Sequence, residues 1–475
     1  MPIVYRFLRD LRLDDHAGLA EASKFGEIVP ALILDQPLTR TLQCSARRAA
    51  FFCEAVTALD ARLREQGSRL IVRRGESTEQ LRDIARQSGA QGVAWSESYD
   101  GTALRHERRM TDELLATGLR VLTVHDAPAV PAAQTTPARS TAGQGYRAFG
   151  PYLEAWKLCE PAFYEASPLL RFSNEALATE EVPQAQEFGA QGNESTATPE
   201  GARAQLARFL TGCAPQYSIG ANVPSEEGTS RLSAHLSFGT ISARSIVRAT
   251  TERCRDPFLL TEERLSLKHF LRALATRDFF LQLRWYHPQT DVLPLQERMR
   301  HFPFASDHPA LKAWFAGRTG FTLVDAGIRQ LHETGWMHPR VRSIAASFLC
   351  FDLGVDWKIG RDEWDRYLTE DDEALASGNW QWVAGVGADL AAYPRIYNPE
   401  RQARRFDPAS QYARQWISEL ARDSGSARSN DEPQLPLFPQ RSYAAPVVVH
   451  RTAAREFLHR YTVFTRQEDV GPASR

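Results

Sequence analysis

Acidic side chains and indoles crowd together in one stretch of the sequence that suits the binding of an aromatic ring system. The stretch reads Asp371-Asp372-Glu373-Ala374-Leu375-Ala376-Ser377-Gly378-Asn379-Trp380-Gln381-Trp382. A carboxylate here could hydrogen-bond the edge of a ring that lies between indoles. Seven of the ten tryptophans lie between Trp285 and Trp382, although a large aromatic core would explain that density equally well.

Two other short segments could bind anions. Gly228-Thr229-Ser230-Arg231-Leu232-Ser233 precedes an apolar helical pattern, and small residues at a helix N-terminus suit a pyrophosphate. The same residues would also serve as an ordinary helix cap. Arg340 and Arg342 could clamp a phosphate or pair with a carboxylate, and a solvated charged face would explain them as well.

The first 125 or so residues alternate apolar runs with amphipathic patterns. The patterns predict helices near residues 45–66, 77–88 and 101–117. Such βαβ alternation indicates a parallel sheet with helices on both faces. No G-x-G-x-x-G follows the first run, so a dinucleotide site there is unsupported. The runs predict strands at 3–7, 29–34, 69–72, 92–95 and 119–124.

The rest of the chain changes character twice. Residues 126–205 are rich in Pro, Ala, Gly, Thr and Glu, which is typical of a connector. From about residue 203 the pattern is helical, with a Ser/Asp/Pro-rich loop at 422–440 and a last helix near 451–463. The predicted fold class is therefore α/β followed by all-helical. The predicted domains are a Rossmann-like α/β domain at 1–130, a connector at 131–204 and a helical domain at 205–475.

The composition excludes several classes of protein. The formal net charge of −1 gives no global basic field for nucleic acid, although a local patch stays open. Six scattered cysteines without a C-x-x-C pair argue against zinc and iron–sulfur ligation and against a secreted disulfide framework. The N-terminus lacks the apolar region of a signal peptide, and no apolar run reaches about 18 residues. We expect a cytoplasmic monomer with no membrane partner.

Several motifs together resemble the FAD-binding domain of photolyases and cryptochromes. Thr229–Ser233 is similar to the phosphate loop of that family, and the resemblance spans nearly the whole chain. The protein is therefore identified as a member of the photolyase/cryptochrome family of blue-light flavoproteins. The motifs are Trp336-Met337-His338 with Arg340 and Arg342, Ala345-Ala346-Ser347-Phe348-Leu349, Asn379-Trp380-Gln381-Trp382, Tyr393-Pro394-Arg395-Ile396-Tyr397-Asn398-Pro399, Phe7-Leu8-Arg9-Asp10-Leu11-Arg12-Leu13 and Tyr146-Arg147-Ala148-Phe149.

The resemblance implies that FAD binds folded in a U within the helical domain. Arg342 would lie beside the isoalloxazine ring with Glu370 as its carboxylate partner, and Asp372 would approach the pyrimidine edge. Arg277 would line the pocket near the phosphates. The residues implied to hold the phosphates and ribitol are Tyr217, Thr229, Ser230, Leu232 and Ser233.

The position that faces the flavin N5 atom departs from the family. Ungapped alignment places Ala376 there, and a one-residue gap would place Ser377 there instead. Alanine can neither hydrogen-bond N5 nor donate a proton to it.

The resemblance also implies a chain of three tryptophans for photoreduction. Trp380 matches the member nearest the flavin, and Trp357 matches the middle member. The outermost position falls on Phe304, which is far harder to oxidise than tryptophan. The usual exit to the surface is thereby interrupted, and Trp314, ten residues further on, is a candidate substitute.

The implied substrate pocket is altered. Cyclobutane-dimer photolyases place a Glu and a Trp, three residues apart on one helix, against the flipped dimer, and the matching positions here hold Ala273 and Thr276. Trp382 keeps the second stacking indole. Losing one aromatic platform should forfeit roughly 1–3 kcal/mol of stacking. Pro339 and Ser343 replace the two His of (6-4) photolyases, so that chemistry is not supported.

DNA is the implied partner, with an antenna chromophore as a second ligand. Arg340 and Arg404 could form part of an Arg-rich rim for phosphates, while Thr276 and Trp382 would face the flipped base. The α/β domain could hold a folate or deazaflavin antenna in the crevice beside its sheet. No motif selects one of these antennas.

Two interpretations follow from this pattern. The first is a photolyase-type lyase in which photo-excited reduced FAD passes an electron to a pyrimidine dimer, with repair impaired by Ala273 and Thr276. The second is a cryptochrome-like photoreceptor, or a photolyase-like protein, that binds FAD without repairing dimers. A non-flavin nucleotide-binding module would explain the α/β half alone.

Overall fold

The computed structural model describes residues 2–135, 145–164, 170–190, 196–388, 393–423 and 443–470. The predicted loop at 422–440 lies outside these residues from 424 onward. The chain separates into two compact units. The first comprises Met1–Ser218, Thr229–Asp291 and Leu368–Ala376, and the second comprises Ile219–Gly228, Val292–Tyr367 and Ser377–Arg475.

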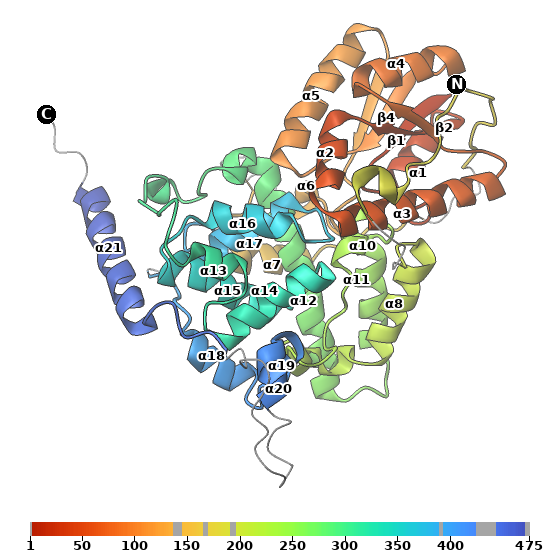
Figure 1. Cartoon of the computed structure of the whole chain (residues 1–475). Coiled ribbons are helices and arrows are strands. Elements are labelled where there is room, and N and C mark those ends of the chain that lie inside the picture. The colour runs from red at the N-terminus through yellow and green to blue at the C-terminus, as the bar shows by residue number, and fades with distance from the viewer. Residues whose placement is uncertain are drawn as a thin grey trace, which may run out of the picture. The chain divides into compact units, whose positions relative to one another are not determined.

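A five-stranded parallel sheet lies at the start of the first unit (Figure 1). Its strand order is β3-β2-β1-β4-β5, so the chain crosses from one side of β1 to the other after β3. This is a doubly wound arrangement, which offers ligand sites outside the carboxyl ends of its strands. All five predicted strands are confirmed, as β1 (Ile3–Phe7), β2 (Ile28–Leu34), β3 (Ile71–Arg74), β4 (Gly92–Ser96) and β5 (Arg120–Val124).

Alternate residues of β1 pack against different layers of helices. Ile3, Tyr5 and Phe7 join a buried cluster with one layer, and Val4 joins a cluster with the other. Both faces of the sheet are therefore buried, which explains why the strands are continuous apolar runs in the sequence. The first layer comprises α1 (Ala17–Ser23), α2 (Gln36–Cys44) and α3 (Ala46–Glu65), and the second comprises α4 (Ser77–Ser88) and α5 (Gly101–Ala116).

The sequence pattern does not predict α1 and α2, which are short and depend on their caps. His16 caps α1, because its Nδ1 accepts the N–H of Leu19 at 3.2 Å. Asp35 caps α2, because its carboxylate accepts the N–H of Leu38 at 3.0 Å. A helix of 7 or 9 residues offers too few turns for a clear apolar period.

The rest of the first unit is helical in its described part. Its longest helix, α12 (Thr261–Tyr286), has 26 residues and buries most of its C-terminal half. Three short helices fall in the predicted connector, whose boundaries stay a prediction. The other elements are α6 (Ala132–Thr135), α7 (Phe149–Lys157), η1 (Ala185–Phe188), α8 (Pro199–Thr211), η2 (Ala214–Gln216), α9 (Tyr217–Gly220), α10 (Ser233–Phe238), α11 (Ala243–Cys254) and η3 (Pro288–Asp291).

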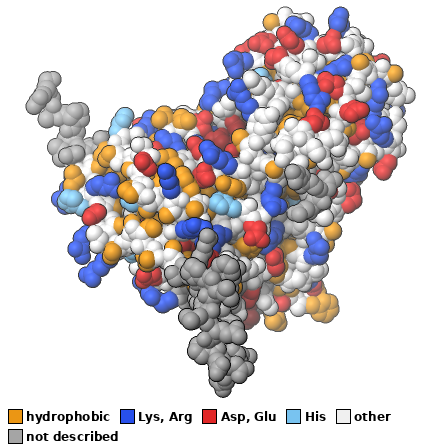
Figure 2. All heavy atoms as spheres, viewed as in Figure 1, with side chains coloured by type: hydrophobic (Ala, Val, Ile, Leu, Met, Phe, Trp, Pro, Cys, Tyr) orange, Lys and Arg blue, Asp and Glu red, His pale blue; other side chains and the backbone are white. Residues whose placement is uncertain are grey.

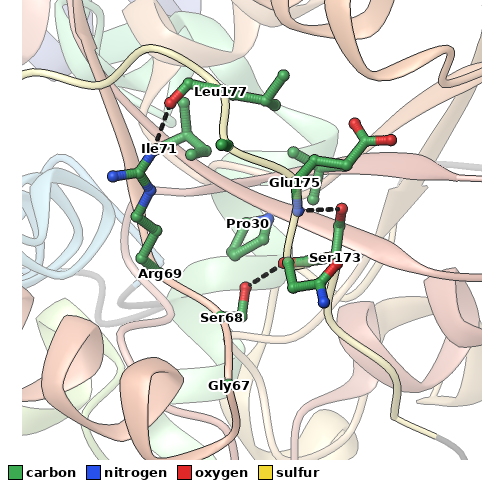
Figure 3. Close-up of a pocket in the computed structure, with 11 residues that line it drawn as sticks. Pro30, Gly67, Ser68, Arg69, Ile71, Ser173, Glu175 and Leu177 are labelled. Carbon is green, nitrogen blue, oxygen red and sulfur yellow. Dashed lines mark hydrogen bonds between the residues drawn. The ribbon is translucent and has the colours of Figure 1, made fainter.

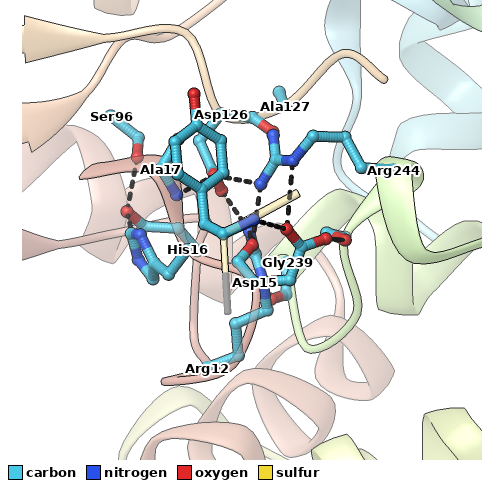
Figure 4. A network of polar contacts seen from close by, with 12 residues as sticks. Arg12, Asp15, His16, Ala17, Ser96, Asp126, Ala127, Gly239 and Arg244 are labelled. Carbon is cyan, nitrogen blue, oxygen red and sulfur yellow. Dashed lines mark hydrogen bonds and ion pairs between the residues drawn. The ribbon is translucent and has the colours of Figure 1, made fainter. Parts of the chain in front are cut away.

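A buried polar network ties the N-terminal segment to α11 within the first unit (Figure 4). Arg12 Nη2 lies 2.6 Å from one carboxylate oxygen of Asp126, and Arg244 Nη2 lies 2.7 Å from the other. Arg244 also donates to the carbonyl oxygen of Asp15 at 2.7 Å. Burial alone would raise the pKa of Asp126, but the charges of Arg12 and Arg244 hold that pKa well below its usual range.

The second unit is also helical, and within the described residues no strand follows β5 along the chain. The predicted last helix is confirmed as part of α21 (His450–Val470). A π-helical turn, η5 (Phe348–Asp352), continues α15. The other elements are η4 (Glu297–Met299), α13 (Leu311–Phe315), α14 (Thr322–Thr334), α15 (Pro339–Ser347), α16 (Trp357–Asp365), α17 (Glu373–Val383, which begins in the first unit), α18 (Pro399–Phe406), α19 (Gln411–Trp416) and α20 (Ser418–Asp423).

The surface carries charges of both signs. On the face drawn in Figure 2, Lys and Arg side chains are interspersed with Asp and Glu, in keeping with the net charge of −1. Among the described residues, no helix combines the length and the apolar character needed to cross a bilayer.

Candidate functional site

The segment Leu368–Ala376, which carries the predicted carboxylates, is fixed by side chains of the first unit. Buried Arg48 donates from Nη2 to the carbonyl oxygen of Glu370 at 3.2 Å. The Ser237 hydroxyl donates to the carbonyl oxygen of Asp371 at 2.7 Å and accepts its N–H at 2.9 Å. These contacts satisfy the backbone of an irregular segment and hold its acidic side chains in place.

Asp372 and Arg277, both assigned to the cofactor pocket, interact electrostatically within the first unit. Burial raises the pKa of Asp372 above its ordinary value, and the charge of Arg277 opposes that rise. Arg277 Nη1 donates to the carbonyl oxygen of Ala127 at 2.7 Å, while its buried Nε has no partner among the described residues. A half-buried carboxylate near a guanidinium with a spare donor suits the polar parts of a ligand.

The predicted phosphate loop leads directly into α10, whose first residue is Ser233. Its N-cap residue is Leu232, and no side chain of the described residues caps the helix. Arg231 has a φ of 50°, a left-handed conformation that turns the chain into the helix. Gln205 Nε2 donates to the carbonyl oxygen of Ser230 at 2.8 Å, which fixes the loop. The first-turn N–H groups of α10 are thus suited to an anion.

Tyr217 lies at the edge of an aromatic cluster in the same unit. Its ring centroid is 5.9 Å from that of Phe209 and 5.3 Å from that of Phe270, both in edge-to-face geometry. Burial raises the pKa of the Tyr217 phenol, so the hydroxyl stays a neutral donor.

Arg340 and Arg342 lie in the first turn of α15, in the second unit. His338 caps this helix, because its Nδ1 accepts the N–H of Arg340 at 3.2 Å. Arg342 Nε donates to the carbonyl oxygen of Met337 at 2.8 Å. Glu370 belongs to the first unit, so the ion pair between Arg342 and Glu370 stays a prediction.

Three tryptophans of the second unit form a closed cluster of rings, in which the ring centroids of Trp314 and Trp380 are 6.5 Å apart. The ring centroids of Trp380 and Trp364 are 4.5 Å apart, and those of Trp364 and Trp314 are 5.9 Å apart with an interplanar angle of 13°. The guanidinium of Arg361 lies 5.2 Å from the ring centroid of Trp357, the predicted middle member. Sequence reasoning did not single out Trp364, although it stands seven residues after Trp357, on the same side of one helix.

Two family models match the chain on either side of its middle. The model described as the FAD-binding domain of DNA photolyase matches residues 270–463, and the model described as DNA photolyase matches residues 3–169. A deoxyribodipyrimidine photo-lyase of Streptomyces griseus is 35% identical over 431 residues, which cover 89% of this chain and 91% of the relative. The chain belongs to the photolyase/cryptochrome family.

Other comparisons agree with this family. A deoxyribodipyrimidine photo-lyase of Halobacterium salinarum is 33% identical over 463 residues, which cover 93% of this chain and 95% of the relative. The crystal structure of a bacterial class III photolyase from Agrobacterium tumefaciens superposes with a TM-score of 0.81 at 27% identity and covers 98% of both chains. The resemblance seen in the motifs and the predicted fold class are both confirmed.

The side chains of the first unit fit FAD, the cofactor of the matched domain. The uncapped first turn of α10 suits its pyrophosphate. The half-buried Asp372 carboxylate and the spare donor of Arg277 suit its polar edges. The individual contacts assigned to FAD, including those of Thr229 and Ala376, stay predictions.

The two substituted positions that the resemblance assigns to the lesion pocket lie near the middle of α12. The Thr276 hydroxyl donates to the carbonyl oxygen of Arg272 at 2.9 Å, so it is already engaged by its own helix. Ala273 is exposed, and Thr276 is half-buried. Trp382, the predicted stacking residue, is half-buried on α17 in the second unit.

Arg340 also borders a cavity of about 610 Å³ within the second unit. The guanidinium carbons of Arg340 and Arg405 lie 4.9 and 5.0 Å from the ring centroid of Phe406. Arg340 Nε donates to Asn222 Oδ1 at 3.0 Å, and Arg404 is exposed on the same helix as Arg405. Two cations held against one ring make a fixed positive site that suits a phosphate.

Two cavities in the described part of the first unit lie at opposite ends of the strands of its sheet. The first, of about 220 Å³, lies where β2 and β3 begin (Figure 3). Its walls are joined by hydrogen bonds from Ser68 Oγ to the carbonyl oxygen of Ser173 (2.5 Å) and from Arg69 Nη2 to that of Leu177 (2.6 Å). This end of a parallel sheet is not where such folds bind ligands.

The second cavity lies at the carboxyl ends of β2 and β3, where ligands of such folds are expected. Its volume is about 530 Å³. Polar side chains and two arginines form most of its wall. The lining residues are Leu34, Gln36, Thr39, Arg40, Gln43, Arg74, Glu187 and Phe188.

Proposed function

We propose that this protein uses blue light and FAD to split pyrimidine dimers in DNA, as a photolyase-type lyase whose lesion pocket is weakened. The observation that supports the proposal most is the fixed acidic segment Leu368–Ala376, which presents half-buried Asp372 near Arg277 inside a chain of photolyase type. FAD, when bound, supplies the light-driven one-electron chemistry.

The chain's own residues hold the cofactor and keep it out of water. The first turn of α10, with Thr229, Ser230 and Ser233, binds the pyrophosphate through N–H groups and hydroxyls. Tyr217 donates a hydrogen bond from its neutral phenol to the phosphates or the ribitol of FAD. Asp372 accepts hydrogen bonds from the pyrimidine edge, and burial raises the pKa of its carboxyl group.

Arginines position the DNA, and aromatic side chains receive the lesion. Arg340 and Arg404 bind backbone phosphates, which fix the register of the DNA without reading its sequence. A dimer flipped out of the helix stacks on Trp382. Thr276 offers no second platform, and Ala273 offers no carboxylate, so we expect slower and weaker repair than a complete pocket would give.

A second candidate function is that of a photoreceptor that binds FAD without repairing DNA. Ala273 and Thr276 favour this function. They replace the Glu and the Trp that hold a cyclobutane dimer in related enzymes. We further propose that the protein acts as a cytoplasmic monomer. A folate or deazaflavin antenna would occupy the cavity lined by Arg40 and Arg74, at the carboxyl ends of β2 and β3.

Binding of a dimer-containing duplex in the dark tests the proposal. We expect the protein to prefer this duplex to an undamaged one, and Arg340→Gln to weaken both and lower the salt slope of binding by about one. Arg86→Gln is the matched control, since Arg86 is an exposed arginine that pairs with Asp83 on α4. Equal affinity for damaged and undamaged DNA would favour the photoreceptor function.

A further inference from the structure

The helix α21, in the second unit, carries a row of cations on its exposed side. Residues 450–466 contain four arginines and one glutamate, in a chain whose formal net charge is −1. The exposed basic side chains of the row are those of Arg451, Arg455, His459 and Arg466. Because these positions are four or seven residues apart, they share one face of the helix. This face, with these four residues, is the α21 stripe.

The opposite face of α21 is fixed on the rest of the second unit. The ring centroid of Phe457 lies 4.8 Å from that of Phe351 and 5.5 Å from that of Phe302. The ring centroids of Tyr461 and Phe302 are 6.0 Å apart, and both Phe457 and Tyr461 are buried. The helix therefore cannot insert this apolar face into lipid, as an interfacial helix does. It presents the α21 stripe in one preorganised orientation.

The arginines of the α21 stripe lack partners of opposite charge. Among the described residues, the side chains of Arg451, Arg455 and Arg466 form no hydrogen bond or ion pair. Other exposed arginines pair with a carboxylate three or four residues earlier in the chain. These pairs are Arg64 with Asp60 (2.7 Å), Arg86 with Asp83 (2.6 Å) and Arg366 with Glu363 (3.5 Å). The charge of the α21 stripe therefore stays available to an external anion.

The α21 stripe begins close to α18, which carries a predicted phosphate ligand. The hydrogen bond to Asp352 raises the pKa of His450, and the charge of Glu400, on α18, adds to that rise. Glu400 and the start of α21 are therefore near each other. Arg404 is exposed on the same helix as Glu400. The α21 stripe thus starts near the predicted DNA-binding rim and extends for about 22 Å along its own helix.

The spacing and type of these cations suit a nucleic-acid backbone. Residues four apart on a helix are separated by about 6 Å along its axis, so the α21 stripe is a line of regularly spaced charges. A DNA strand is a regular line of negative charges, whereas the charges of an acidic protein surface follow no such repeat. Guanidinium groups bind phosphate oxygens through several donors at once.

We propose that the α21 stripe binds the phosphate backbone of duplex DNA that flanks the lesion. Phosphate contacts add affinity and fix orientation without reading the sequence. The α21 stripe therefore strengthens the binding of damaged and undamaged DNA alike, while the preference for a lesion comes from the predicted stacking on Trp382. The proposal rests on the proposed function for the choice of DNA as the partner.

The salt dependence of binding to a long undamaged duplex tests the α21 stripe. The stripe variant replaces three arginines by glutamine, as Arg451→Gln, Arg455→Gln and Arg466→Gln. The slope of log affinity against log salt concentration should become shallower by about 2.7, because each lost phosphate contact removes about 0.9. Between about 50 and 200 mM salt, the stripe variant should therefore lose affinity by a factor about 40 times smaller than the unmodified protein does.

A matched control removes the same number of charges from paired sites. It carries Arg64→Gln, Arg86→Gln and Arg366→Gln, so its net charge equals that of the stripe variant. We expect the control to keep the salt slope of the unmodified protein. Equal salt slopes for the two triple variants would overturn the inference.

Phenylglyoxal labelling of arginines, read by peptide mass spectrometry, needs no variant and so decides the matter even if the stripe variant fails to fold. Duplex DNA should protect Arg451, Arg455 and Arg466 in the unmodified protein and leave Arg86 reactive. Equal labelling of α21 with and without DNA would overturn the inference. Protection by phosphatidylglycerol vesicles but not by DNA would overturn it as well.

The same measurements separate this inference from the proposed repair of dimers. The stripe variant should weaken binding to damaged and undamaged duplexes by the same factor and keep the ratio of the two affinities. Protection of α21 by both duplexes, without any preference of the unmodified protein for the damaged one, would refute the proposed lesion binding and support the α21 stripe.

Discussion

Thr276 is the single residue at which the proposed repair activity is most restricted. Its hydroxyl bonds to its own helix at Arg272, and its small side chain offers no surface for stacking. Ala273, one helical turn earlier, offers no hydrogen-bonding group. Of the positions that the family resemblance assigns to the lesion, only Trp382 carries an aromatic ring.

We expect Thr276→Trp to strengthen the binding of dimer-containing DNA in the dark. An added indole platform supplies about 1–3 kcal/mol of stacking, which corresponds to roughly 5- to 150-fold in affinity. Fluorescence anisotropy with a labelled duplex measures this change. Thr276→Leu is the control for added apolar surface, and equal affinities of the two variants would contradict the stacking role of this position.

Among the structural elements, α16 positions the cluster of indoles formed by Trp314, Trp364 and Trp380. Trp357, Gly360 and Trp364 lie on one side of it, three or four residues apart, and Trp380 fills the gap above Gly360. Leu349 closes the same gap, since its Cδ2 would lie 2.4 Å from a Cβ at Gly360.

We expect Gly360→Ala to destabilise the second unit, because its methyl group overlaps both Trp380 and Leu349. Such overpacking costs about 1–3 kcal/mol of unfolding free energy, which urea denaturation measures. Gly150→Ala is the matched control, because a Cβ there meets no atom within 4 Å and the change favours the helix by up to about 1 kcal/mol. Equal stabilities of the two variants would contradict the close packing at Gly360.

The attachment of α21 should depend on pH through His450. Its hydrogen bond to buried Asp352, 2.6 Å long, raises the pKa of His450. A raised histidine pKa contributes stability that is fully present below the unfolded value of about 6.5 and is lost as the pH rises through the folded value. We therefore expect His450→Gln to lower the unfolding free energy more at about pH 6 than at about pH 9. A pH-independent difference would contradict this ion pair.

Several elements could be predicted from the sequence, and others could not, for physical reasons. The five strands could be predicted because a sheet covered on both faces requires continuous apolar runs. α1 and α2 could not, because their signals are the caps His16 and Asp35 rather than an apolar period. Trp364 was missed because its contact with Trp380 joins two helices, and no local pattern records such a contact.

At the scale of the whole molecule, the network around Asp126 joins the start of the chain to α11 within the first unit. Its two carboxylates and two guanidiniums are at most 4% exposed. Buried charges of this kind tolerate the loss of one partner poorly, because the other stays desolvated and unpaired.

We expect Arg244→Met to lower the unfolding free energy by about 3–5 kcal/mol, because Asp15 and Asp126 lose a shared partner. Arg248→Met is the matched control on the same helix, since exposed Arg248 lies over the ring of Phe163 and such a contact contributes about 0.5–1 kcal/mol. Thermal unfolding of both variants measures the difference. If both variants lowered the unfolding free energy equally, the buried network around Asp126 would not stabilise the fold.

The central claim is tested most directly by the repair of a cyclobutane thymine dimer in DNA by the purified, photoreduced, FAD-loaded protein under blue light, with darkness as the control. We expect a flavin absorbance spectrum and light-dependent repair, slower than a complete lesion pocket would give. A flavin spectrum with no repair above the dark control would contradict the account and support a photoreceptor.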